Sequence, residues 1–213
     1  MSERRPRPKD KRKARARGAS ARRGNGLWVG LGIAAVLVVG VLGLRAAGIF
    51  EPPPGNIDVN DPRFTVGPDG IGTKVPDEGS AHVPAGQRVS YRTNPPTSGA
   101  HWGQPAGPVP WGIKDAELPA EAVVHNLEHG GVVIWHKGLT TDERADLEGV
   151  VRALRSQGYN KIIVMPYAGL QDAKVGLTAW TWLHKLEEYD EAQVIQFVRA
   201  RYEPAEAPER NVP

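Results

Sequence analysis

Residues 122–136 read AVVHNLEHGGVVIWH, and this stretch decides the fold of the chain. Its second part, Val132–His136, is short, apolar and rich in β-branched residues, which predicts a buried strand. The glycine pair Gly130-Gly131 interrupts the chain just before that strand. Residues 122–125 have the same short apolar character, so we predict another strand there. The chain is therefore expected to fold around strands at its centre.

The residues after this stretch predict two helices and two more strands. Thr140 is a typical helix N-cap followed by acidic residues, and Gly158 stands at the end of the apolar positions that follow with helical spacing. Strands are predicted at 161–165 and 177–183, and Asp190 caps a last helix. This order predicts an α+β fold, with a small, mainly antiparallel sheet and two helices packed on one face.

Residues 27–44 read LWVGLGIAAVLVVGVLGL and carry no charge. A helix of this length spans about 27 Å, which is close to the thickness of the hydrocarbon core of a bilayer. The basic residues near the N-terminus precede this run, and basic flanks stay in the cytoplasm. We therefore predict a single-pass protein of the cell membrane, with a cytoplasmic tail at 1–26, one transmembrane helix at 27–47 and an extracytoplasmic C-terminal domain.

A cleaved signal peptide is the alternative for the same run, and Arg22-Arg23 is compatible with a twin-arginine signal. Two features argue against cleavage. The apolar run is longer than the roughly 7–15 residues usual for the core of a signal peptide, and residues 43–47 offer a poor small-x-small cleavage site. In either case the folded domain is expected outside the cytoplasm.

Charge and cysteine content limit the classes of function. The net charge of +3 combines +9 at residues 1–26, from eleven basic and two acidic side chains, with −6 for the rest of the chain. The basic charge therefore belongs beside anionic lipid, and no nucleic-acid partner is expected. The chain has no cysteine, which excludes disulfides, thiolate metal sites and redox dithiols.

Composition divides the exported part into three segments. Residues 48–80 are rich in Pro, Gly, Asp and Glu, which predicts a linker. Residues 81–203 form the expected folded domain, and residues 204–213 have the composition of a disordered tail. All six histidines of the chain lie in the expected domain.

The histidines predict a transition-metal site. His125 and His129 are four residues apart, a spacing at which two imidazoles can hold one ion. His101, in an aromatic loop, is the natural third ligand, and Met165 is the candidate for a soft fourth. Methionine among the ligands would favour copper, whereas a carboxylate would favour zinc. Glu128 is expected to orient a ligand by hydrogen bonding to it.

The alternative for these histidines is structural, since buried histidines commonly hydrogen-bond to a carbonyl oxygen. If a metal site exists, Tyr91, Trp102 and Trp111 are expected to form its wall. The remaining histidines are expected not to be ligands; they are His82, His136 and His184.

A hydrolase is the second function that the pattern leaves open. The run His125-x-x-Glu128-His129 matches the inverted zincin motif, in which two histidines bind zinc and the glutamate is the general base. This motif requires a continuous helix, and the breaker Gly130-Gly131 follows it at once. No catalytic residue is therefore assigned, with Glu128 the candidate only if the chain is a zinc-dependent hydrolase.

A binding module is the third function left open. Long loops with aromatic side chains are often functional, and tryptophan is enriched at protein contacts. Trp102 and Trp111 would then contact another protein of the cell envelope.

Two sequence blocks resemble a known family. They are Asn94-Pro95-Pro96-Thr97-Ser98-Gly99-Ala100-His101-Trp102 and Val124-His125-Asn126-Leu127-Glu128-His129-Gly130-Gly131-Val132. These blocks look like the signatures of the bacterial domain of unknown function 3105 family. Ala179-Trp180, and Phe197 ahead of Pro204-Ala205-Glu206, resemble its C-terminal blocks.

The resemblance covers residues 70–206 and implies topology rather than activity. Members are similar in having one N-terminal anchor helix and an exported domain without an established function. The resemblance also sets His101, His125, Glu128 and His129 apart, because they lie inside the signature blocks. The segment Gly112-Ile113-Lys114 departs from the family pattern in the loop that is expected to wall the site.

Overall fold

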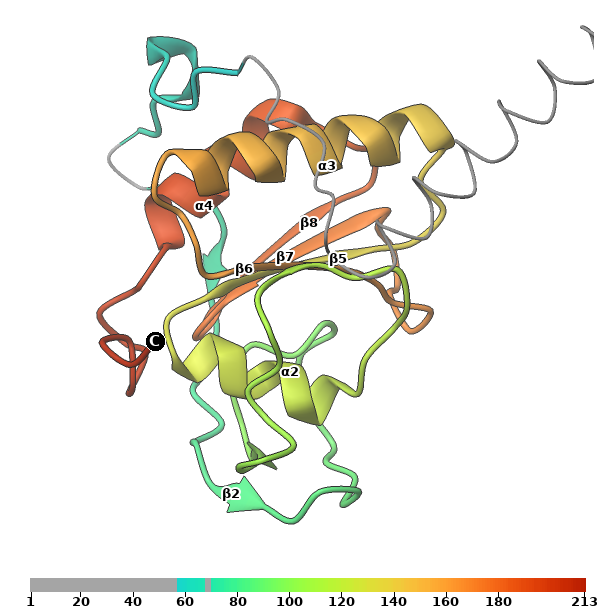
Figure 1. Ribbon diagram of the computed structural model, residues 1–213, viewed down its shortest axis with the longest axis vertical. Helices are drawn as coiled ribbons and strands as arrows, with labels where there is room; N and C mark the ends of the chain where they lie inside the picture. Colours follow the sequence, from blue (N-terminus) through green and yellow to red (C-terminus); the bar gives the residue numbers. More distant parts are fainter. Residues whose placement is uncertain (1–56, 68–69) are drawn as a thin grey trace, which may run out of the picture. The chain divides into compact units, whose positions relative to one another are not determined.

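The computed structural model describes residues 57–67 and 70–213 (Figure 1). The chain divides into two units, Met1–Pro52 and Pro53–Pro213, and the described residues belong to the second. The predicted tail at 1–26 and the predicted transmembrane helix at 27–47 lie outside the described residues. Within the described ranges, no helix is both long and apolar enough to cross a bilayer.

A mixed sheet forms the centre of the described domain. Its strands, in spatial order, are β1 (Thr73–Lys74), β8 (Trp182–Leu186), β7 (Val175–Ala179), β5 (Val132–His136), β6 (Ile162–Pro166) and β4 (Gly112–Ile113). The pairings from β1 to β5 are antiparallel, whereas β5 with β6 and β6 with β4 are parallel. A separate two-stranded ribbon pairs β2 (His82–Val83) in parallel with β3 (His101–Trp102). The sheet is mainly antiparallel, as predicted.

Helices cover both faces of the sheet. On one face lie α3 (Thr141–Ser156) and α4 (Glu191–Arg201), with the short 3-10 turn η1 (Pro62–Phe64) beside α4, and on the other lies α2 (Ala120–Glu128) (Figure 1). The alternation of side chains along β5 explains this arrangement. Val132 and Ile134 belong to the core beneath α3 and α4, whereas Val133 and Trp135 belong to the core beneath α2. The α+β class is confirmed, with a third helix on the opposite face.

The ends of α3 and α4 follow the predicted capping chemistry. The Thr140 side chain accepts a hydrogen bond from the Glu143 amide, and the Glu143 carboxylate accepts one from the Thr140 amide, which completes a capping box. Asp190 caps α4 by accepting from the amide of Gln193. These local signals lie entirely within the sequence, so both helices start where the sequence predicts.

Two predicted strands are wrong in detail. Residues 122–125 belong to α2, because Val123, Val124 and Leu127 have helical spacing and together face the sheet. The helix stops where Gly130 adopts a φ of 81°, a conformation that favours glycine. Residues 177–183 do not form one strand: the chain turns at Thr181, whose φ is 61°, and β7 and β8 form an antiparallel hairpin.

Both terminal parts of the described chain pack on the domain. Val59 and Phe64 are fully buried in the core with α3 and α4, although composition suggested a linker there. At the other end, residues 203–213 form what we call the C-terminal segment. Its Glu209 amide donates to the Glu128 carbonyl at 3.0 Å, and Ala207 is buried. This segment was expected to be a disordered tail, but its main chain is hydrogen-bonded to the domain.

Candidate metal centre

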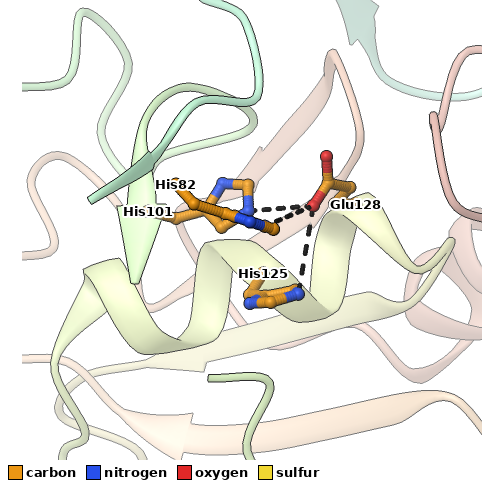
Figure 2. A group of neighbouring side chains, drawn as sticks. All are labelled: His82, His101, His125 and Glu128. Carbon is orange, nitrogen blue, oxygen red and sulfur yellow. Dashed lines mark hydrogen bonds and ion pairs between the residues drawn. The ribbon is translucent and has the colours of Figure 1, made fainter. Parts of the chain in front are cut away.

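The face of α2 that points away from the sheet carries His125 and Glu128. Since Val123, Val124 and Leu127 take the opposite face, helical geometry turns these two polar side chains toward the β2–β3 ribbon. Figure 2 shows the group that results, which we call the four-residue cluster: His82, His101, His125 and Glu128.

The β2–β3 ribbon supplies the other two histidines. Its register pairs His82 directly with His101, and the His101 amide donates to the carbonyl of Ala81 at 3.0 Å. The pairing places two imidazoles next to each other although they lie 19 positions apart in the sequence. The ring centroids of His82 and His101 are 4.9 Å apart, and each is 4.8 Å from that of His125.

The three imidazoles converge on a single carboxylate oxygen. The distances to Glu128 Oε2 are 2.9 Å from His101 Nε2, 3.4 Å from His82 Nε2 and 4.0 Å from His125 Nε2 (Figure 2). The four donor atoms of the cluster all lie within 4.8 Å of one another. Tetrahedral zinc has ligands at about 2.0–2.2 Å, which places ligand atoms about 3.3–3.6 Å apart. Closing the cluster around an ion would therefore shorten its longer separations and lengthen the 2.9 Å contact between His101 and Glu128.

Main-chain carbonyl groups fix the other nitrogen of two of these rings. His101 Nδ1 lies 2.8 Å from the Gly99 oxygen, and His125 Nδ1 lies 2.7 Å from the Trp102 oxygen. A carbonyl oxygen can only accept, so each Nδ1 carries the hydrogen. In the neutral imidazole, Nε2 is then the nitrogen with a free lone pair, and it is the nitrogen turned into the cluster. Histidine ligands of metals are commonly oriented by such a bond.

Burial and nearby charges shift the pKa values of His125 and Glu128 toward the protonation states that bind a cation. Burial lowers the pKa of His125, the Trp102 carbonyl partly offsets this, and the neighbouring histidines lower it further. Burial raises the pKa of Glu128, but its contacts with His101 and Ser80 and the nearby His125 outweigh burial, and the net pKa is lowered. A neutral imidazole and an ionised carboxylate are the forms that bind metals.

The cluster is closed on one side and open on the other. His101, His125 and Glu128 are each at most 3% exposed, whereas the side chain of His82 is 49% exposed. Solvent therefore reaches the cluster on the side of His82.

A second group of potential ligands adjoins the first through His125. It consists of His125, His129 and Glu209, whose donor atoms also lie within 4.8 Å of one another. His129 caps the C-terminal end of α2, and its Nε2 lies 3.2 Å from Glu209 Oε2. The rings of His125 and His129 meet edge to face at 4.9 Å between centroids.

The structure places the predicted ligands in three different surroundings. His101 and His125 come together with Glu128, and Glu128 lies among the donor atoms rather than behind them. His129 lies in the adjoining group. Met165 is fully buried on β6, in the apolar core between the sheet and α2.

The sequence predicted His82 not to be a ligand, but the structure places it in the four-residue cluster. Nothing in its local sequence marks it as a ligand, since its role depends on the pairing of β2 with β3. His184 bonds to Gln193 and stacks on Phe197, and His136 lies on β5; neither is in a donor group.

The three aromatic residues predicted to wall the site have different surroundings. The Tyr91 hydroxyl donates to the Ala100 carbonyl at 2.8 Å, next to His101. The Trp102 ring donates to the Gln87 carbonyl, and the Trp102 carbonyl holds His125. Trp111 packs against the core beneath α2. All three rings are half-buried.

Comparison with known proteins gives one match. A family model described as "Protein of unknown function (DUF3105)" matches residues 82–213 of the chain. No curated protein and no solved structure matches it. The matched range begins at His82 and contains every residue of both donor groups.

Proposed function

We propose that this chain, which belongs to the DUF3105 family of proteins of unknown function, binds a divalent transition metal ion in its four-residue cluster. The ion that best suits the cluster is zinc. The domain that carries it is, in this proposal, held at the outer face of the cell membrane by the apolar segment 27–47.

One observation carries the metal proposal: three Nε2 atoms converge on the same carboxylate oxygen. Because the Nδ1 atoms of His101 and His125 donate to carbonyl groups, each of these Nε2 atoms in the neutral ring directs a lone pair at Glu128. Lone pairs facing a carboxylate repel unless a cation lies between them. A proton can bridge one of the three contacts, whereas a metal ion satisfies all of them.

The donor atoms favour zinc over copper. Three imidazole nitrogens and one carboxylate oxygen form a set that zinc takes in tetrahedral geometry. The thioether that would have favoured Cu(I) belongs to Met165, which lies on the sheet side of α2. The chain has no cysteine, so no thiolate is available to either donor group.

The test compares zinc binding by the full chain, purified in detergent, with that of a His82→Ala variant. His82 is half-exposed, so its loss leaves the core of the domain intact. At a free zinc concentration of 100 Kd, a site that exists only in the folded state stabilises it by about 2.7 kcal/mol. For a domain of this size that is roughly 5–11 °C in Tm.

The matched control is His184→Ala, which removes a half-buried histidine outside both groups. Wild type and His184→Ala should carry zinc after dialysis and gain stability from it, and His82→Ala should bind more weakly. A wild-type chain without bound zinc and without a zinc-induced rise in Tm would end the proposal.

The proposed membrane topology is tested by cysteine labelling. Because the chain has no cysteine of its own, any labelling comes from the introduced residue. Single cysteines at Ser2 and at the exposed Glu187 are offered to a membrane-impermeant maleimide in intact cells. The basic flank and the uncharged run support labelling at Glu187→Cys alone. Labelling of Ser2→Cys in its place would reverse the proposed topology.

A zinc-dependent hydrolase is the second candidate, and one observation favours it. The helix that the His125-x-x-Glu128-His129 motif requires is present, because α2 runs to Glu128 and His129 is its C-cap. Against it, Glu128 Oε2 lies among the imidazole nitrogens as a ligand would. Glu128→Gln separates the two: a base variant keeps its zinc and loses turnover of a test peptide or ester, whereas a ligand variant loses affinity for zinc.

The scaffold alternative has less support. Trp102 and Trp111, the proposed contact residues, are both half-buried; the Trp102 ring donates to the Gln87 carbonyl, and Trp111 packs against the core beneath α2. Within 57–67 and 70–213, the large apolar residue that is exposed is Val212, at 40%.

A further inference from the structure

We propose that a second zinc ion binds next to the first, held by His125, His129 and Glu209. This inference rests on the proposed zinc site in the four-residue cluster. It adds a separate ion, whose ligands include a residue of the C-terminal segment.

The second group repeats the local arrangement of the first. His129 Nδ1 lies 3.0 Å from the main-chain oxygen of Pro213, so that nitrogen carries the hydrogen. In the neutral ring, Nε2 then keeps its lone pair, and it lies 3.2 Å from Glu209 Oε2. As for His101 and Glu128, a nitrogen and a carboxylate oxygen come this close with a proton or a metal ion between them, and a metal ion that displaces the proton would take this position.

Glu209 is held in place, although its side chain is 43% exposed. Its own amide donates to the carbonyl of Glu128, at the end of the helix that carries His125. The ammonium group of Lys161 donates to the carbonyls of Arg210 and Val212 at 2.7 and 2.8 Å, and to that of His129 at 3.1 Å. The main chain is therefore held to the domain at Glu209 and in the residues that follow it.

The two groups share His125, and its Nε2 has one lone pair, so it can bind only one ion at a time. With both ions bound, the six donors divide into two equal sets. The first is His82, His101 and Glu128, and the second is His125, His129 and Glu209. Each set has two imidazoles and one carboxylate, which is the protein ligand set of several catalytic zinc sites.

This division has a chemical consequence. Three protein ligands leave one position of a tetrahedral zinc ion for water or for a substrate oxygen. Two such ions a few ångströms apart can bind one substrate together, as in two-metal hydrolytic sites. The class of ligand for the second site is therefore a divalent zinc-like cation, and its arrival frees a position on the first ion.

The experiment counts zinc in the full chain, in detergent, by metal analysis after dialysis and by titration calorimetry. The test variant is Glu209→Gln, which keeps the size of the side chain and removes its charge. The matched control is Glu203→Gln in the same segment, whose carboxylate is equally exposed, at 42%, and pairs with Lys161. Glu203 belongs to neither donor group.

Wild type and Glu203→Gln are expected to bind about two zinc ions per chain, and Glu209→Gln about one, with the tighter event kept. One ion in both wild type and Glu209→Gln would overturn the second site and leave the first intact. Loss of both ions in a folded Glu209→Gln variant would also overturn it, since the groups would then form a single site. No zinc in wild type would instead reject the proposed function itself.

Discussion

Gly107 lies beside the hydrogen bond between the Trp102 carbonyl and His125. The variant Gly107→Ala therefore tests the role of this orienting bond without removing a metal ligand. A Cβ at this position would lie 2.7 Å from the Trp102 oxygen, 3.1 Å from the Ala122 oxygen and 3.2 Å from His125 Nδ1. The first of these distances is shorter than real Cβ contacts allow, and the atom it meets belongs to the main chain. The main chain therefore has to shift at Trp102 or Gly107, which disturbs the 2.7 Å hydrogen bond between the Trp102 carbonyl and His125.

The size of the effect follows from these contacts. Overpacking of a closely packed site costs about 1–3 kcal/mol, and for a domain of this size each kcal/mol lowers Tm by about 2–4 °C. Gly107→Ala should therefore lower Tm by about 2–12 °C. Loss of an orienting hydrogen bond on a histidine ligand weakens metal binding by about 10–100-fold, so the affinity for zinc should fall by that factor.

Gly103→Ala is the control for this prediction, because it lies in the same loop and its Cβ would make only ordinary contacts with His82, the nearest at 3.5 Å. The two variants are compared by thermal unfolding without metal and by zinc calorimetry. If Gly107→Ala matches Gly103→Ala in both measurements, the bond between His125 and Trp102 neither limits packing nor orients a ligand, and the reasoning is refuted.

Three further predictions concern the frame that carries the site. Gln193 donates hydrogen bonds to the Asp190 carboxylate and lowers its pKa. The carboxylate therefore stabilises the folded state fully at pH values above the ordinary pKa of aspartate. This stabilisation is lost as the pH falls through the lowered pKa of Asp190. Asp190→Asn should therefore flatten the acid limb of a plot of the free energy of unfolding against pH; a limb identical to that of wild type would contradict this. Gly149→Ala should raise stability by about 0.5–1 kcal/mol in denaturant unfolding, because the position is inside α3 and its Cβ would meet nothing closer than 3.9 Å. Destabilisation there would mean that the helix surface is more crowded than the structure shows. Trp135→Phe should cost about 1–3 kcal/mol in the same assay, since it leaves the buried Thr178 hydroxyl without the ring N–H that donates to it at 2.8 Å; an unchanged midpoint would contradict that role.

The parts of the fold that sequence predicted are those with local signals. The capped helices α3 and α4 and the apolar strand β5 depend on residues adjacent in the chain. The helix α2 was misjudged because Val123 and Val124 are β-branched and the element is only nine residues long, so the same letters fit a strand.

In the site, as in the fold, sequence predicted the residues that lie close together in the chain and not those that folding brings in from far away. The spacing of His125, Glu128 and His129 pointed to a metal, because four-residue spacing is informative by itself. His82 joins the cluster only through strand pairing, and Glu209 joins only through docking of the C-terminal segment. Neither pairing leaves a pattern in the neighbouring residues, so no reading of short motifs could have found these two side chains.

The β2–β3 ribbon has a consequence for how the domain moves. It consists of two residues on each strand and contributes none of the buried apolar residues of either core, whereas α2 is packed on the main sheet. Small elements with few buried contacts open at a lower free energy than the domain as a whole. If the ribbon separates from α2 while the sheet stays folded, His82 and His101 move away from Glu128. Release of a bound ion would then require a local opening event, and its rate would be set by the ribbon rather than by the stability of the domain.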